Sequence, residues 1–206
     1  MGFFGVSDYL AFVFAFLTLL FIPGPGNLAI MVSTTKGGWH AGLTATLGLL
    51  MGDQVLLWLA VAGVSSLLGA VPGALMVAQW IGATYLAWLG LRMLLAKTGA
   101  SNILHIHPNS FFRQAFVITI LNPKAVVFYM AFLPMFIDPL YHLGFLTFFV
   151  MALTVAFLGA VYCCCVVFLT FFLSGGATTG PRIGGWMQKI AGLVLLLFAV
   201  RMAWWK

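Results

Sequence analysis

Only 6% of the 206 residues are charged, whereas 64% are hydrophobic, and the mean hydropathy is +1.15. A soluble domain carries roughly a quarter charged residues because its surface faces water, so this composition excludes an ordinary soluble protein and indicates a surface that faces lipid. The net charge of +6 comes from single basic residues between apolar blocks, without the basic stripe that nucleic-acid binding needs. We expect the lipid bilayer as a partner and no nucleic acid.

Apolar segments long enough to cross a bilayer follow one another along the chain. They cover residues 8–32, 40–68, 73–96, 112–137, 143–173 and 186–205. The one long polar connector, residues 97–111, falls near the chain midpoint. The sequence therefore predicts an all-α integral membrane protein in which residues 1–206 form a single transmembrane domain of about six helices.

The halves of the chain on either side of this connector, residues 8–96 and 112–205, resemble each other. The segment AFLTLLFIP (residues 15–23) aligns with AFVITILNP (residues 115–123). Because each half holds an odd number of helices, the two copies would lie in opposite orientations across the membrane. We therefore expect a 3+3 inverted repeat, which is the plan of many secondary transporters.

The basic residues predict the orientation of the chain, because Lys and Arg gather in cytoplasmic loops. The first, third and fifth connectors carry them, whereas the second and fourth carry none. With six spans, this places the 97–111 loop in the cytoplasm and both termini outside. Arg201 and Lys206 disagree with this assignment, and a re-entrant first segment would move the N-terminus inside. The basic residues of the odd connectors are Lys36, Arg92, Lys97, Arg113, Arg182 and Lys189.

Two predicted helices, the first and the fourth, are interrupted at corresponding positions of the halves. Proline removes a backbone donor and clashes with the preceding turn, and backbone without its helical bonds is not tolerated facing lipid. A single proline kink is ordinary structure, but matched breaks point to the substrate site of a transporter. The predicted substrate-binding residues are Pro23, Gly24, Pro25, Gly26 and Asn27 in the first break, and Asn122, Pro123 and Lys124 in the second.

Asp53 and Lys124 lie near the middle of the second and fourth apolar segments. A charge at this depth costs about 2.5–3.5 kcal/mol even on insertion scales. They could form a structural ion pair, or Asp53 could stay protonated and bond to a broken helix. Alternatively, Asp53 binds a substrate ammonium or carries a transported proton, while Lys124 binds a substrate carboxylate.

Other motifs offer less chemistry. Gly48 and Gly52 form a GxxxG pair, which is a packing device for membrane helices. Three consecutive cysteines, residues 163–165, point in different directions on a helix and cannot chelate a metal together. His105 and His107 in the polar connector could bind a metal but have no acid or cysteine nearby. We predict no catalytic residue, no metal site and no cofactor.

The motifs FIPGPGNLAIMV (residues 21–32), GLLMGD (48–53) and LNPKAVVFY (121–129) resemble those of the LysE/RhtB family of amino-acid exporters. The order, the spacing and the total length agree as well, so that the resemblance covers almost the whole chain. It implies export of amino acids and is greatest to the leucine, threonine and homoserine branch. Gly26 departs from the pattern, since Asn often follows the PGP there. The acid that some relatives carry near Ala156 is also absent, which favours neutral substrates.

The sequence thus predicts a secondary transporter, not an enzyme, that exports neutral amino acids across the inner membrane by proton antiport. A divalent-cation exporter of a related membrane family is the alternative, although it needs several oxygen or sulfur ligands at mid-depth. An intramembrane enzyme would need a paired acid and base, and a scaffold without transport would leave metabolite flux unchanged. Six short helices have a small perimeter, which is compatible with a homodimer.

Overall fold

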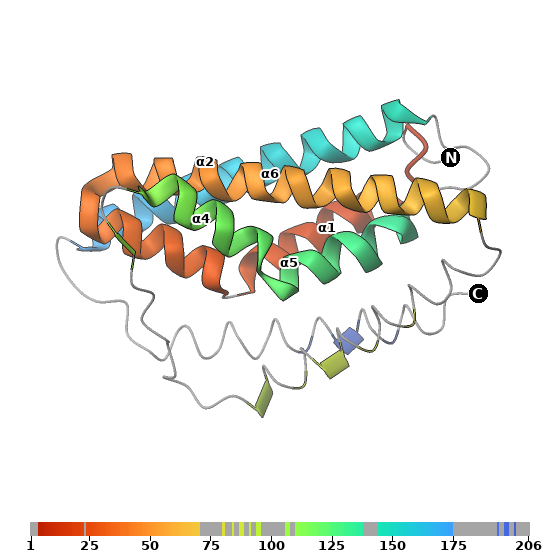
Figure 1. Cartoon of the computed structure of the whole chain (residues 1–206). Coiled ribbons are helices and arrows are strands. Elements are labelled where there is room, and N and C mark those ends of the chain that lie inside the picture. The colour runs from red at the N-terminus through yellow and green to blue at the C-terminus, as the bar shows by residue number, and fades with distance from the viewer. Residues whose placement is uncertain are drawn as a thin grey trace.

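The computed structural model describes residues 4–22, 24–70, 106–107, 110–137 and 144–174, with single helical residues inside the ranges 80–95 and 193–200. Throughout this part of the chain the regular elements are helices (Figure 1). Its one β-type contact is an isolated bridge between Val6 and Ile137. The elements are α1 (Tyr9–Phe21), α2 (Pro25–Ala70), α4 (Phe111–Ile120), α5 (Pro123–Val127), the π-helix η2 (Phe128–Phe132), the 3-10 helix η3 (Leu133–Phe136) and α6 (Phe145–Ser174).

Helix α2 folds back on itself at Gly37 and Gly38. Gly38 has φ +71° and ψ −170°, a backbone region that is essentially restricted to glycine. The two arms of α2, residues 25–36 and 39–70, then run side by side in opposite directions (Figure 1). A Cβ at Gly26 would lie 3.0 Å from Leu49 Cδ1, although the two residues are 23 positions apart. The predicted first segment is therefore α1 plus the first arm, and the predicted second segment is the second arm.

The second arm of α2 packs closely against α4 and α6. A Cβ at Gly52 would lie 2.8 Å from Thr119 Cβ, and one at Gly48 would overlap the backbone carbonyl of Phe112. On the α6 side, a Cβ at Gly159 would lie 2.9 Å from Leu50 Cδ2. The glycine pair thus permits the close helix approach that its spacing predicts.

Both predicted helix breaks are present. Helix α1 ends at Phe21, and α2 begins at Pro25. The second break separates α4 from α5, and the two helical pieces meet at an angle of 53°. The predicted fourth segment therefore consists of α4, α5, η2 and η3.

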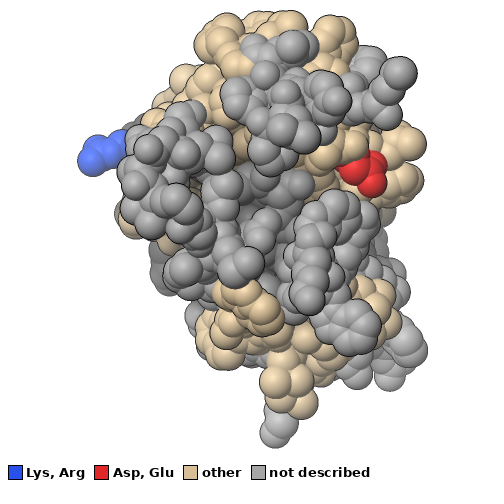
Figure 2. Space-filling model, turned by 90° about the vertical axis from the view of Figure 1, so that its right-hand side faces the viewer, with Lys and Arg blue, Asp and Glu red and all other residues tan. Residues whose placement is uncertain are grey.

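The described helices have the length and composition of membrane spans. By length and composition, Phe145–Leu173 and Pro25–Gly63, most of which is the second arm of α2, are apolar enough to cross a bilayer, and the bent α4–α5 pair could supply a third span. The face in Figure 2 shows only isolated charged side chains among the described residues, as expected of a surface in lipid. The predicted segments 73–96 and 186–205 lie outside the described residues except at single positions, so six spans and the inverted repeat remain predictions.

Candidate functional site

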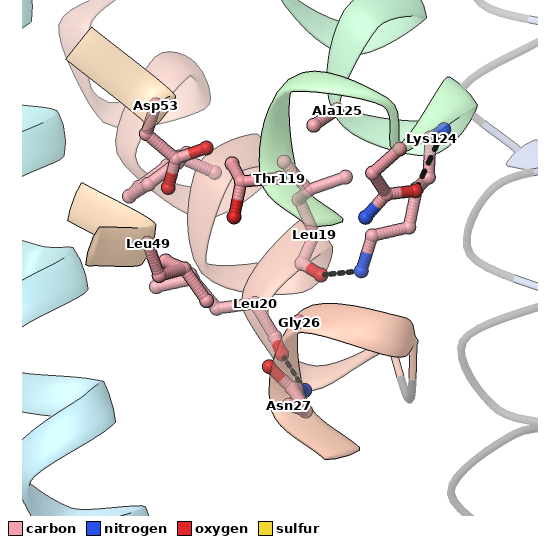
Figure 3. A pocket seen from close by; sticks show the side chains of 11 residues that line it. Leu19, Leu20, Gly26, Asn27, Leu49, Asp53, Thr119, Lys124 and Ala125 are labelled. Atoms are coloured by element: carbon pink, nitrogen blue, oxygen red, sulfur yellow. Dashed lines mark hydrogen bonds between the residues drawn. The ribbon is translucent and has the colours of Figure 1, made fainter. Parts of the chain in front are cut away.

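A small cavity with polar side chains in a mainly apolar lining lies where the two helix breaks meet the second arm of α2 (Figure 3). Its volume of about 40 Å³ leaves room for about three water molecules. It is lined by Phe16, Leu19 and Leu20 of α1, by Gly26, Asn27, Leu49 and Asp53 of α2, and by Thr119, Asn122, Lys124 and Ala125 around the second break.

The cavity brings together most of the predicted site residues. Gly26, Asn27, Asp53, Asn122 and Lys124 all line it, although they come from three separate stretches of sequence.

The other predicted residues do not line the cavity. Gly24 lies beside the cavity, because a Cβ there would be 3.3 Å from Lys124 Nζ. Pro25 and Pro123 begin the helices that follow the breaks. Pro23 lies outside the described residues.

Lys124 is bound to the end of α1. Its ammonium donates hydrogen bonds to the carbonyl oxygens of Leu19 and Ile22, at 3.1 and 3.0 Å. These carbonyls lie at the C-terminus of α1, where backbone N–H donors run out and where the helix dipole favours a cation. Leu19 O also accepts from the Ile22 N–H at 3.2 Å, whereas within the described part of the chain only side-chain donors reach Ile22 O. The lysine therefore caps the broken helix from across the cavity.

Asn27 completes the capping of α1. Its side-chain amide donates to Leu20 O at 3.0 Å and to Ile22 O at 3.4 Å. The same amide donates to the hydroxyl of Tyr162 on α6 at 3.0 Å. Side chains from both breaks thus satisfy the carbonyls that the end of α1 leaves free.

Asp53 and Lys124 do not pair directly. Asp53 is 7% exposed and lies across the cavity from Lys124, whose ammonium points to Leu19 instead (Figure 3). The ion pair between Asp53 and Lys124, which was one interpretation of the sequence, is therefore not formed in this conformation. The two opposite charges remain on separate sides of one small space.

Asn122 acts as the N-cap of α5. Its side-chain oxygen accepts a hydrogen bond from the Lys124 N–H at 3.1 Å, which is the usual role of asparagine at a helix start. The sequence predicts Asn122 as a substrate-binding residue of the second break, and the structure adds a local structural role at the start of α5.

Two tyrosines contact the site residues, and the sequence analysis assigned neither of them. Tyr162 accepts from Asn27. Tyr129 is fully buried and lies close to the Asp53 carboxyl, yet among the described residues its hydroxyl has no hydrogen-bond partner. Both look like packing aromatics inside apolar runs. The available signal was the hydroxyl itself, because a buried tyrosine usually needs a polar partner.

The described residues hold no cluster of three or more His, Cys, Asp or Glu side chains that could bind a metal. Cys163 is buried, Cys164 is half-buried and Cys165 is exposed, so the three thiols point in different directions. The backbone N–H of His107 donates a hydrogen bond to the side-chain oxygen of Gln114. His105 lies outside the described residues.

Helical spans that break around a cavity holding a few polar side chains are typical of membrane transporters. Residues 17–205 match the family described as LysE type translocator, and the chain belongs to this family. This confirms the resemblance that the three motifs indicated. The family and the efflux proteins related to the chain point to a transporter rather than an enzyme.

Several relatives are similar over nearly their whole length. A leucine efflux protein of Klebsiella pneumoniae is 30% identical over 204 residues, covering 97% of this chain and 96% of the relative. A leucine efflux protein of Enterobacter sp. is 29% identical and covers 97% of each chain. An uncharacterized membrane protein of Pseudomonas aeruginosa is 30% identical over 193 residues, with 90% and 85% covered. No solved structure matches the chain.

Proposed function

We propose that the protein exports neutral amino acids of the leucine type across the bacterial inner membrane in exchange for protons. The observation that carries the proposal is the cavity between the two helix breaks, with Asp53 on one side and Lys124 on the other. A site that binds a zwitterionic amino acid needs a negative group for its ammonium and a positive group for its carboxylate. Membership of the translocator family and the similarity to leucine efflux proteins support the same class of substrate.

The remaining cavity lining suits an aliphatic side chain. Phe16, Leu20 and Leu49 are apolar, and burial of methylene groups against such residues contributes about 0.8 kcal/mol each. Asp53 is the one acid among the lining residues. If Asp53 binds the amine or carries the proton, no second carboxylate of the lining remains for the side chain of lysine or arginine.

The alternative of a divalent-cation exporter has no observation in its favour. Such a site needs several oxygen or sulfur ligands around one point, and the cavity lining offers a single carboxylate.

The experiment is efflux of leucine from cells loaded with a leucine-containing dipeptide. Wild-type protein should speed efflux above that of cells without it, and Asp53→Asn should reduce efflux to the background rate. Asp8→Asn is the matched control, because it removes the same charge at the N-cap of α1, where asparagine caps equally well. Equal amounts of each variant in the membrane must be verified.

Each outcome has a distinct meaning. Normal export by Asp53→Asn would show that this carboxyl has no part in the cycle. Unchanged efflux of every amino acid by the wild-type protein would refute the substrate class.

A further inference from the structure

The ammonium of Lys124 occupies a cation site made of backbone oxygens. The carbonyls of Leu19 and Ile22 accept its hydrogen bonds at 3.1 and 3.0 Å, and Leu19 lines the cavity together with Lys124. The dipole of α1 adds negative potential at this end. The site therefore suits a cationic N–H donor, and a primary ammonium group fits it whether or not it belongs to a lysine.

An amino-acid substrate carries the same group. Its α-ammonium has the charge and the three N–H donors of a lysine ammonium, so it can replace Lys124 at these carbonyls. The displaced lysine is then free to turn its ammonium to the carboxylate of the same substrate.

We propose that Lys124 holds the ammonium site of the empty protein and exchanges with the substrate, whose ammonium takes the Leu19 and Ile22 carbonyls while Lys124 binds its carboxylate. This inference rests on the proposed function and adds the recognition step to it. In this exchange the substrate ammonium, the Lys124 ammonium and the substrate carboxylate each have a polar partner. That matters because an uncompensated buried charge is strongly destabilising.

The surroundings of Lys124 permit this movement. Gly24 leaves space beside the ammonium, since a Cβ there would lie 3.3 Å from Nζ. Asn27 continues to donate to Leu20 O and Ile22 O, so the end of α1 stays capped after the lysine leaves. The cavity of about 40 Å³ is too small for an amino acid, so binding must displace something, and a flexible lysine side chain is suited to move.

A simpler arrangement predicts different behaviour. If Asp53 alone bound the ammonium and Lys124 alone bound the carboxylate, the Leu19 and Ile22 carbonyls would play no part in binding. Removing the lysine would then weaken carboxylate binding, and the affinity for an amine would change only through the loss of one nearby positive charge.

The test measures binding of 3-methylbutylamine, which is leucine without its carboxylate, to the purified full-length chain in lipid nanodiscs by calorimetry. Wild-type protein should bind this amine weakly, because Lys124 already holds its site. Lys124→Met should bind it at least about tenfold more tightly, because a hydrogen bond to a charged group exceeds the free energy of a tenfold change. An unchanged or lower affinity in Lys124→Met overturns the exchange.

Two control variants separate this effect from the loss of any lysine. Lys124→Arg keeps a cation at the carbonyls and should bind the amine as weakly as the wild type. Lys36→Met removes a comparable bond outside the cavity, from Lys36 Nζ to Ile106 O at 2.9 Å, and should leave amine affinity unchanged. A gain in Lys36→Met equal to that in Lys124→Met would also overturn the proposal.

A second measurement needs no variant and avoids the risk that Lys124→Met fails to fold. In the wild-type protein, acetate should draw Lys124 away from α1 and raise the affinity for 3-methylbutylamine several-fold, compared with chloride at equal ionic strength. No difference between acetate and chloride contradicts the exchange.

Binding and efflux fail separately. If Lys124→Met binds the amine more tightly but the wild-type protein exports no leucine, the exchange is retained and the substrate class is refuted. If the wild-type protein exports leucine but Lys124→Met gains no amine affinity, the exporter function is retained and the exchange is refuted.

Discussion

Asn27 joins three helices through one side-chain amide. It lies near the start of α2, donates to two carbonyls of α1 and its C-cap, and donates to Tyr162 of α6. All three acceptors are oxygens that the donor must reach from one position. The site therefore depends on an amide here, and a carboxylate of the same size cannot replace it.

The Asn27→Asp variant tests this dependence. Its carboxylate would place oxygen against the oxygens of Leu20 and Ile22, with no N–H to donate. We expect a loss of about 1–3 kcal/mol in the free energy of unfolding and a clear fall in leucine efflux. Tyr162→Phe is the matched control, because it removes one acceptor and leaves both carbonyl bonds. Thermal unfolding in detergent should rank Asn27→Asp below Tyr162→Phe, and the opposite order would contradict the capping role.

Several residues that line the cavity could be named from the sequence, but their hydrogen-bond partners could not. Asp53 and Lys124 were recognisable as charges at mid-depth. The carbonyls that bind Lys124, by contrast, belong to Leu19 and Ile22, whose side chains give no sign of this role. A backbone oxygen becomes available only because of how α1 ends and where α5 meets it.

At the scale of the element, the reversal of α2 depends on the backbone of Gly38. Its φ of +71° and ψ of −170° suit glycine, whereas a Cβ there would meet nothing within 4 Å. Any cost of a side chain at this position is therefore conformational and not steric crowding from neighbours.

Gly38→Ala should lower the free energy of unfolding by about 1–3 kcal/mol. Gly63→Ala is the control, because this glycine also has open space around it but lies within the helical second arm, where alanine stabilises by roughly 0.5–1 kcal/mol. Denaturation of both variants in the same detergent should shift the midpoint in opposite directions. An unchanged or higher midpoint for Gly38→Ala would show that the reversal does not require the glycine conformation.

The helix breaks could be predicted because their cause is local. Pro25 and Pro123 each begin a helix, and the prolines and glycines at the breaks can be read directly from the sequence. The contacts of Tyr129 and Tyr162 with the site residues could not be predicted from the sequence, because they depend on how η2 and α6 pack against α2. The reversal at Gly38 appeared in the sequence only as a connector between two apolar segments.

At the scale of the whole molecule, the proposed topology has six spans in a 3+3 inverted repeat, with the 97–111 loop in the cytoplasm and both termini outside. The positive charges of the odd connectors carry this proposal. A homodimer is compatible with it, and nothing in the site requires a second copy.

Fusions to a fluorescent protein that matures only in the cytoplasm test this topology. A fusion truncated after residue 101 should be bright, and a fusion after residue 206 should be dark at equal protein amount. A bright C-terminal fusion would place that end inside, which an even number of spans with an external N-terminus does not allow.

The size of the cavity has a consequence for kinetics. A space of about 40 Å³ is no channel, and a substrate passes only when helices separate around it. Such movements take microseconds to milliseconds. The flux per molecule should therefore saturate with internal substrate and depend steeply on temperature, as in a carrier, and a cell gains export capacity by making more copies rather than by widening a pore.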